Sequence, residues 1–283
     1  MMTQVPEPEA PEGIDLERPN AARIYDWFLG GTANWAIDRE FGERAVQTFP
    51  MIKTIAKASR EFLGRGVRYL AEQGVDQFLD LGSGVPTVGN VHEIATAVNP
   101  GARCVYVDNE PVAVAHSQIL LEREGVAYRH AVLQGDLRHP SEIWNQAMDT
   151  GVLDPKRPIG LIVVGVLYFL GRDEPAVEII RQYLSMLPSG SYFLSSHLTN
   201  DGVQTPDRAL REQIHQQYQR SSTPFHYRSR AEFGEFFAGL ELVEPGIVWV
   251  PDWRPELGES RAGARMAGNP SFSGSICGLG RKP

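Results

Sequence analysis

The sequence predicts an α/β protein built on a doubly wound, mostly parallel sheet of seven strands. From residue 52 to residue 195, short apolar segments alternate with single segments of amphipathic helical spacing. Strands that are joined through one helix form right-handed crossovers, which place helices on both faces of a parallel sheet. The last third of the chain adds two strand-like segments, and these suit an antiparallel hairpin at the edge of the sheet.

Each element follows from its own pattern of apolar residues. Five parallel strands are expected at 77–81, 103–107, 128–133, 159–167 and 191–195, because each is a short apolar run. Helices are expected at 52–72, 91–98, 112–124, 142–148 and 174–187. The last third predicts helices at 206–220 and 230–239 and strands at 240–250 and 271–280. The loop 251–270 is either disordered or a flap on the substrate side.

The composition disfavours several classes of protein. A net charge of −8 and a pI near 5.4 argue against a nucleic-acid partner, since binding to phosphates depends on clustered Lys and Arg. The longest apolar run, 159–170, is far shorter than the roughly 20 residues of a membrane span. Segment 1–13 lacks the apolar core of a signal peptide. We therefore expect a cytoplasmic monomer or homodimer that acts on a small molecule, without a membrane partner.

The two cysteines predict no special chemistry. Cys104 and Cys277 lie in apolar strand-like segments and are expected to be reduced, buried side chains. No CxxC pair or Cys/His cluster is present, so we expect no metal site.

A glycine turn and three acidic residues predict a nucleoside-binding crevice. They occur at the ends of the first three expected strands, in Asp80 with Gly82-Ser83-Gly84, in Asp108-Asn109, and in Gly135-Asp136-Leu137. Open α/β sheets bind ligands at the carboxyl ends of their strands, where these residues should meet. Asp108 is placed to bind ribose hydroxyls and Asp136 to meet an adenine amino group. Alone, either residue would also suit a turn or a helix N-cap.

The glycine pattern favours a nucleoside without phosphate groups. A dinucleotide fingerprint requires a third glycine, whereas Thr87 occupies that position and Pro86 lies in the turn. No Lys-Ser or Lys-Thr follows the glycines, as an ATP-binding loop would require. S-adenosylmethionine has no phosphate, and its sulfonium and amino-acid groups suit a carboxylate such as Asp80. An NAD(P)-dependent oxidoreductase is the less favoured alternative.

The chain also resembles a known family through motifs spread over residues 18–281. They are found at 22–26, 29–31, 34, 81–87, 90–93, 106–109, 136–138, 196–197 and 253–255. By these motifs it resembles a bacterial S-adenosylmethionine-dependent methyltransferase family that was long catalogued as a domain of unknown function. The resemblance implies a class I, Rossmann-like methyltransferase fold with S-adenosylmethionine as cofactor. It implies no particular methyl acceptor.

The expected domain organisation places this cofactor between a cap and a core. Residues 1–15 are rich in Pro and Glu and predict a disordered tail. The remaining residues, 16–283, predict one methyltransferase domain. In it we expect a helical cap at 16–50, a cofactor-binding core at 51–200, and substrate-side helices with the hairpin at 201–283.

The cap contains polar groups on both sides of Gly30-Gly31, which permits a tight bend. One interpretation is a lid in which Tyr25, Asp26 and Asn34 hold the methionine end of the cofactor. The other is an amphipathic helix pair with Tyr25 and Trp27 as core aromatics. Arg60 and Arg23 are candidates for pairing with the methionine carboxylate, although structural ion pairs are the commoner role. Val164, near the end of the fourth strand, completes the predicted cofactor contacts.

Two residues are candidates for work on the methyl acceptor. His197, at the end of the fifth strand, is the predicted general base, because imidazole titrates near neutral pH. A hydrogen-bonded structural histidine is an equally good interpretation of it. Tyr168, after the fourth strand, is expected to face the acceptor. The sequence thus predicts a methyltransferase of EC class 2.1.1, with a non-catalytic or regulatory S-adenosylmethionine-binding protein as the alternative.

Overall fold

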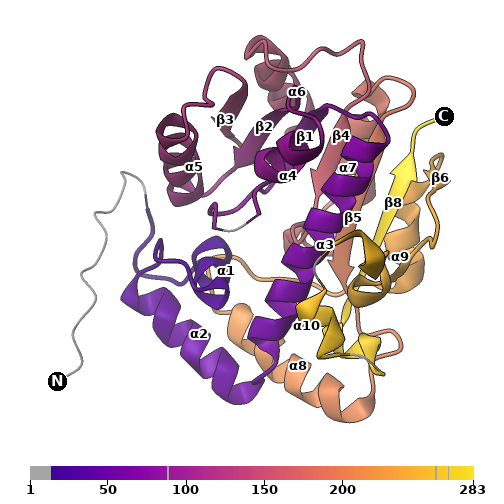
Figure 1. The fold of residues 1–283 in the computed structure, drawn as a ribbon. Helices are drawn as coiled ribbons and strands as arrows, with labels where there is room; N and C mark the ends of the chain where they lie inside the picture. Colours follow the sequence, from indigo (N-terminus) through magenta and orange to yellow (C-terminus); the bar gives the residue numbers. More distant parts are fainter. Residues whose placement is uncertain (1–13, 88, 259, 267) are drawn as a thin grey trace.

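The computed structural model describes residues 14–87, 89–258, 260–266 and 268–283, and its centre is one eight-stranded sheet (Figure 1). The strands are β1 (Gln77–Leu81), β2 (Arg103–Asp108), β3 (His130–Gln134), β4 (Gly160–Val163), β5 (Tyr192–Leu198), β6 (Glu241–Leu242), β7 (Val248–Trp249) and β8 (Ser275–Arg281). Their order is β3-β2-β1-β4-β5-β8-β6, and β7 also pairs with β8. The first five strands are parallel, whereas β8 is antiparallel to its neighbours. The predicted doubly wound, mostly parallel sheet is confirmed.

Helices cover both faces of this sheet, as parallel strands require. They are α1 (Ala21–Leu29), α2 (Ala36–Thr48), α3 (Ile52–Glu72), α4 (Val91–Val98), α5 (Pro111–Arg123), α6 (Pro140–Asp149), α7 (Ala176–Met186), α8 (Thr205–Tyr218), α9 (Arg230–Gly234) and α10 (Arg261–Ala264). Alternate residues of β1 face opposite layers: Leu79 packs with α6 and α7, and Phe78 packs with α3 and α4. Cys104 and Cys277 are free and fully buried, as predicted.

The structure has one strand more than predicted, because the expected strand 240–250 is interrupted. Its two ends form β6 and β7, which pair with different parts of β8. Pro245, between them, has no N–H to donate to a strand ladder. The turn is completed by a hydrogen bond from Gly246 N to Val243 O, with Gly246 at φ +79°.

The fourth strand is shorter than predicted. β4 ends at Val163, and Gly165 follows at φ +76°. The rest of the expected strand becomes a turn and a short 3₁₀ helix, η1 (Leu167–Phe169). The apolar run therefore continues beyond the strand because its side chains stay buried, with Leu167 and Leu170 in the core.

The loop 251–270 is predicted to be disordered or a flap. Its described residues are instead ordered and packed. It contains α10 and short 3₁₀ turns that pack along α3. Trp253 is fully buried, with its ring 5.5 Å from that of Phe62 and 6.0 Å from that of Tyr69. Arg65 in α3 donates to the carbonyl oxygens of Trp253 and Val250.

A separate cluster of helices lies at one end of the sheet (Figure 1). It contains α1 and α2 from the start of the described chain and α8 from its last third. Their apolar faces form one core that includes Ile24, Phe28, Phe41, Ile214 and Tyr218. Most of the tail predicted at 1–15 lies outside the described residues.

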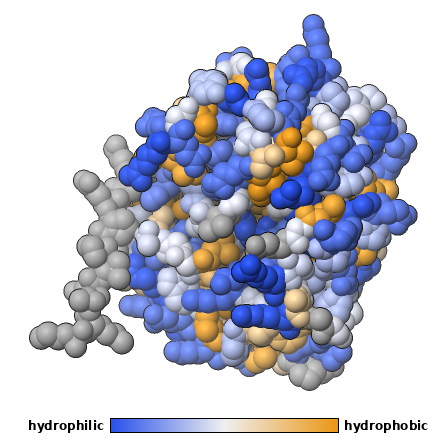
Figure 2. Space-filling model, in the orientation of Figure 1, coloured by the Kyte–Doolittle hydropathy of each residue, from blue (hydrophilic) through white to orange (hydrophobic). Residues whose placement is uncertain are grey.

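The described helices and the visible surface show no membrane-like segment. None of these helices has both the length and the apolar composition needed to cross a bilayer. On the face shown in Figure 2, hydrophobic residues occur in small groups separated by hydrophilic ones.

Candidate functional site

A cavity of about 480 Å³ lies where the strand ends face the cluster of α1, α2 and α8. Its volume is within the range of about 300–1,000 Å³ that is typical of small-molecule sites. Twelve of the thirteen residues predicted to contact a cofactor line it: Tyr25, Arg60, Asp80, Gly82, Ser83, Gly84, Asp108, Asn109, Gly135, Asp136, Leu137 and Val164. Tyr168 also lines it, whereas Asn34 and His197 are not part of its lining.

The loop after β1 is shaped by two glycines in the left-handed region. Gly82 has φ +69° and Gly84 has φ +68°. The N–H groups of Gly82 and Ser83 both donate to Val107 O in β2, at 2.8 and 3.1 Å. A Cβ at Gly82 would lie 2.5 Å from Val166 Cγ2, whereas one at Gly84 would meet no atom within 4 Å. The loop is thus packed on one side and open on the other.

This difference predicts unequal costs for two matched substitutions. We expect Gly82→Ala to lower the free energy of unfolding by about 2–4 kcal/mol, since it adds overpacking to backbone strain. Gly84→Ala should cost only about 1–2 kcal/mol, because only the strain applies. Urea unfolding would measure both values, and Val166→Ala should recover part of the loss in Gly82→Ala. Equal costs for the two glycines would contradict the packing argument.

Asp108 connects the ends of β1 and β2. Its Oδ2 accepts a hydrogen bond from Gly84 N at 2.7 Å, and its Oδ1 accepts one from Glu110 N at 2.9 Å. Burial raises the pKa of Asp108, and the backbone N–H groups oppose this shift. A carboxylate has about four acceptor sites, and the N–H groups of Gly84, Glu110 and Asn109 use up to three of them, so acceptor capacity remains for a ligand. Asp108 therefore positions the glycine loop and still has capacity to accept hydrogen bonds from hydroxyl groups.

Asp80, at the end of β1, is a buried carboxyl group in the cavity wall. Burial raises its pKa to about 7, with Arg60 opposing the shift and Asp108 adding to it. Near neutral pH the group is therefore poised between its neutral and charged forms. A cation bound beside Asp80 would favour the charged form.

The end of β3 contributes a charged edge to the cavity. Gly135 N donates to Asp108 O at 2.9 Å, which joins this loop to β2. Arg138 forms ion pairs with Asp136 and with Glu174. These three side chains are each about one-third exposed. Leu137 lies beside them and packs against the core formed by α6 and α7.

Two polar residues of the helices reach the same cavity. The Tyr25 hydroxyl of α1 donates to Ala56 O in α3 at 2.9 Å, and burial raises the pKa of Tyr25. Arg60 of α3 donates from Nη2 to Asn90 Oδ1 at 3.0 Å. Both residues are therefore oriented by the protein before any ligand arrives.

Asn34, predicted to contact a cofactor, instead holds the bend after α1. Its Nδ2 donates to Asp26 Oδ2 at 2.7 Å and to Gly31 O at 3.0 Å. The carboxyl group of Asp26 lies where a Cβ of Gly31 would be, at 1.9 Å from its Oδ1. The motif of Asp26, two glycines and Asn34 thus builds the bend and lies outside the cavity wall.

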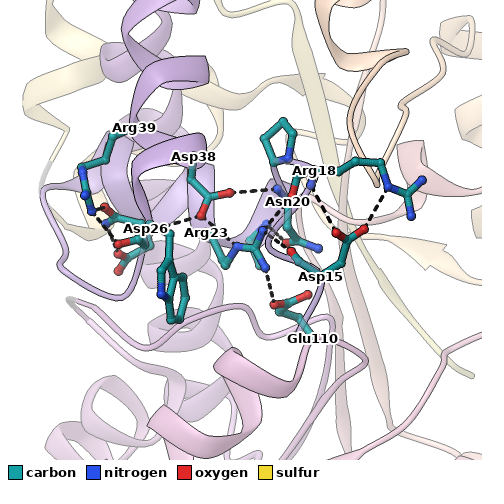
Figure 3. Close-up of polar contacts among 12 residues, drawn as sticks. Asp15, Arg18, Asn20, Arg23, Asp26, Asp38, Arg39 and Glu110 are labelled. Carbon is teal, nitrogen blue, oxygen red and sulfur yellow. Dashed lines mark hydrogen bonds and ion pairs between the residues drawn. The ribbon is translucent and has the colours of Figure 1, made fainter. Parts of the chain in front are cut away.

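Arg23 is a structural residue as well (Figure 3). Its guanidinium pairs with Asp38 of α2 at 2.8 Å and with Glu110 at 3.2 Å. It also donates to the carbonyl oxygens of Asp15 and Arg18. Glu110 is two residues beyond Asp108 and precedes α5, so this cluster fastens α1 and α2 to the strand-end loop that carries Asp108.

His197 is buried away from the cavity, which corrects its prediction as a general base. It is 0% exposed, and both ring nitrogens are used: Nδ1 donates to Leu198 O at 2.8 Å, and Nε2 accepts from Arg228 at 3.1 Å. Burial lowers its pKa to about 4. Tyr168 lines the cavity with its ring edge-on to His197 and Phe225, and burial raises its pKa far above the usual value. A Tyr with such a pKa donates hydrogen bonds and does not act as a base near neutral pH.

Sequence reasoning missed the other half of the cavity. Its wall is aromatic and includes Phe28, Phe49, Phe169, Tyr218, Phe225 and Tyr227, together with the cationic or titratable residues Arg211 and His226. These residues come from α1, the turn between α2 and α3, η1, α8 and the loop after α8. The segment Pro224-Phe225-His226-Tyr227 is a dense group of ring side chains, and this density was the one available signal.

The strand order and the position of the cavity define a class of protein. A ligand site at the carboxyl ends of β1, β2 and β3, with strand-end carboxylates and no phosphate-binding lysine, is that of a class I S-adenosylmethionine-dependent methyltransferase. Residues 7–283 match the model of the S-adenosyl methyltransferase family, and the chain belongs to that family. The resemblance found in the sequence is thereby confirmed, and S-adenosylmethionine is the cofactor.

Solved structures agree with this assignment. A DUF574 family protein of Streptomyces avermitilis is 35% identical with a TM-score of 0.84, covering 94% of this chain and 98% of that one. A protein of Thermobifida fusca is 36% identical with a TM-score of 0.84, covering 96% and 98%. An O-methyltransferase family protein of Burkholderia thailandensis shares only the fold, at 14% identity and a TM-score of 0.51, covering 94% and 64%. No curated protein matches the chain.

Proposed function

We propose that the protein transfers the methyl group of S-adenosylmethionine to a small-molecule acceptor bound in the aromatic half of the cavity. The observation that supports this most is the continuity of one cavity from the strand-end carboxylates to the aromatic wall. A cofactor and an acceptor in one cavity would meet the main requirement of methyl transfer, which is proximity and orientation. The net charge of −8 also disfavours a nucleic-acid acceptor.

The residues present fit this cofactor. In our proposal Asp108 binds the ribose hydroxyls and Asp136 meets the adenine amino group beside Leu137. Asp80, Tyr25 and Arg60 surround the methionine end, and α1 and α2 form the cap over it. When bound, S-adenosylmethionine supplies an activated methyl group on a sulfonium sulfur. The glycine loop has no lysine for phosphates and has open space beside Gly84, as a phosphate-free nucleoside requires.

His226 replaces His197 as our candidate for the general base. It lines the aromatic half of the cavity, and its ring takes part in no hydrogen bond among the described residues. Burial, with His215 and Arg228, lowers its pKa from the usual 6.5, so the imidazole is neutral near pH 7. A neutral imidazole can accept the proton that a hydroxyl or amine acceptor loses on methylation. Tyr168, kept protonated by its raised pKa, would orient the acceptor by donating a hydrogen bond.

His226→Gln should lower kcat by about 10²–10⁴-fold, with little change in cofactor affinity. In the wild-type protein, activity should fall toward acid as His226 becomes protonated, with a midpoint below the usual histidine pKa of 6.5. The measurement is kcat against pH for an acceptor identified by label transfer from methyl-labelled cofactor. His139→Gln, which removes an exposed histidine outside the cavity, is the matched control. Unchanged kcat in His226→Gln would exclude it as the base.

Calorimetry followed by a turnover assay tests the function itself. The protein should bind S-adenosylmethionine and S-adenosylhomocysteine but not NAD. Incubation with methyl-labelled cofactor and a small-molecule extract should then transfer label to an organic product. Binding of both nucleosides with no transfer to any acceptor would favour the non-catalytic, regulatory alternative. Binding of NAD alone would overturn the cofactor assignment.

A further inference from the structure

The aromatic half of the cavity contains a buried arginine that has no carboxylate partner among the residues the structure describes. Arg211 of α8 is 5% exposed and lines the cavity. Its guanidinium packs against Gly274, where a Cβ would be 2.0 Å from Nη1, and its Cζ is 5.3 Å from the ring centre of Phe49. Nη2 donates to Phe272 O, whereas the buried Nε has no partner among the described residues.

The other two arginines of the cavity wall have side-chain partners. Arg138 pairs with two carboxylates, and Arg60 donates to the amide oxygen of Asn90. Within the described part of the chain, no ion pair involves Arg211. Burial lowers its pKa, and Asp207 and Tyr227 oppose the shift only through longer-range attraction. A guanidinium nevertheless stays charged, so Arg211 presents a buried positive charge that lacks compensation.

The two halves of the cavity differ in charge: on the strand side, Arg60 and Arg138 already bond to protein groups and lie beside three acidic residues. Asp80, Asp108 and Asp136 lie on the strand side, where a cationic cofactor is expected. Arg211 lies on the aromatic side, which is formed by Phe49, Tyr218, Phe225 and other rings. Such a wall favours flat rings, which pack edge-on or offset against aromatic side chains. The guanidinium favours an anion, because charge-assisted hydrogen bonds to carboxylates or phenolates are the strong ones.

We propose that the methyl acceptor is a small aromatic anion, with its ring against the aromatic wall and its anionic group on Arg211. This inference rests on the proposed function, since it names the substrate class of the same site. Arg211 acts here as a binding residue that compensates the anion and sets which end of the acceptor faces the strand-end carboxylates. The repulsion between those carboxylates and the anion reinforces this orientation.

Matched acids and amides test the proposal by binding alone. The full-length protein, saturated with S-adenosylhomocysteine, is titrated with benzoate against benzamide and with phenylacetate against phenylacetamide. The acids should bind about tenfold or more tightly than the amides. Cyclohexanecarboxylate, an acid without an aromatic ring, should bind more weakly than benzoate. Equal affinities within each acid–amide pair, or no detectable binding of any acid, would overturn the proposal.

Variants assign the effect to the arginine. Arg211→Gln should abolish the preference for acids, Arg211→Lys should keep part of it, and Arg208→Gln, an exposed arginine on the same helix, should leave it intact. If Arg211→Gln does not fold, the acid–amide titrations of the wild-type protein and of Arg211→Lys still test the proposal. Binding of S-adenosylhomocysteine separates a failure of the proposed function from a failure of the proposed acceptor class. Its absence in the wild-type protein would refute the proposed function, whereas its presence with equal acid and amide affinities would refute only the acceptor class.

Discussion

Asp108→Ala should weaken the binding of S-adenosylhomocysteine by about 2–4 kcal/mol, which is roughly 30-fold to 1,000-fold. Two losses add up in this variant. The contact that we propose between the carboxylate and the ribose hydroxyls is lost, and the N–H groups of Gly84 and Glu110 lose their acceptors at 2.7 and 2.9 Å. The glycine loop is then no longer fixed to the end of β2. Isothermal calorimetry on the purified variant measures the change.

Controls separate the ligand contact from the loop. Asp149→Ala, which removes an exposed carboxylate outside the cavity, should bind as the wild type does. Asp108→Asn keeps one oxygen acceptor and should fall between the wild type and Asp108→Ala. Urea unfolding without ligand reports the cost to the loop alone. An unchanged dissociation constant in Asp108→Ala would show that the ribose assignment is wrong.

Arg23→Met should lower the free energy of unfolding by about 3–5 kcal/mol. The substitution leaves Asp38, which is 0% exposed, and Glu110 as buried carboxylates without their cation. It also removes the donors that hold the chain at Asp15 and Arg18 (Figure 3). Because Glu110 precedes α5 and follows Asp108 closely, we also expect a lower affinity for the cofactor. Urea unfolding monitored by tryptophan fluorescence gives the first effect, and calorimetry gives the second.

The matched control is Arg18→Gln, which breaks an exposed ion pair with Asp15. Exposed pairs contribute about 0–1 kcal/mol, so this variant should unfold nearly as the wild type does. The double variant Arg23→Met/Asp38→Asn should be less destabilised than Arg23→Met alone if the uncompensated charge of Asp38 is the main cost. A loss below about 1 kcal/mol in Arg23→Met would contradict the buried-charge account.

The fold was predictable where local patterns decide it. Short apolar runs and single amphipathic helices are enough to require parallel strands with helices on both faces. The errors lie where burial extends an apolar run beyond its strand, as at 164–167 after β4. They also lie where a proline interrupts pairing, as between β6 and β7. In both places the tertiary environment keeps the residues apolar although the backbone has left the ladder.

The candidate site was half predictable, because its two halves have different origins. The strand side, where we propose that the cofactor binds, comes from consecutive strand ends, whose residues carry a fixed motif and meet at one edge of the sheet. The aromatic side comes from α1, the turn between α2 and α3, η1, α8 and the loop after α8, which are distant in the sequence and have no shared pattern. His197 shows why a role cannot be predicted from position alone. It lies at a strand end as a general base would, yet Arg228, 31 residues away in the sequence, donates a hydrogen bond to its Nε2.

The sequence by itself determined the sheet, the glycine loop and the three strand-end carboxylates, and with them the class of cofactor. These features depend on residue spacing along single strands and turns, which the chain carries locally. Only the tertiary structure decided what each polar group does. It buried Arg23 and His197, placed Asn34 against Asp26, and left Arg211 without a carboxylate partner among the described residues, because burial and partners are set by contacts between distant segments.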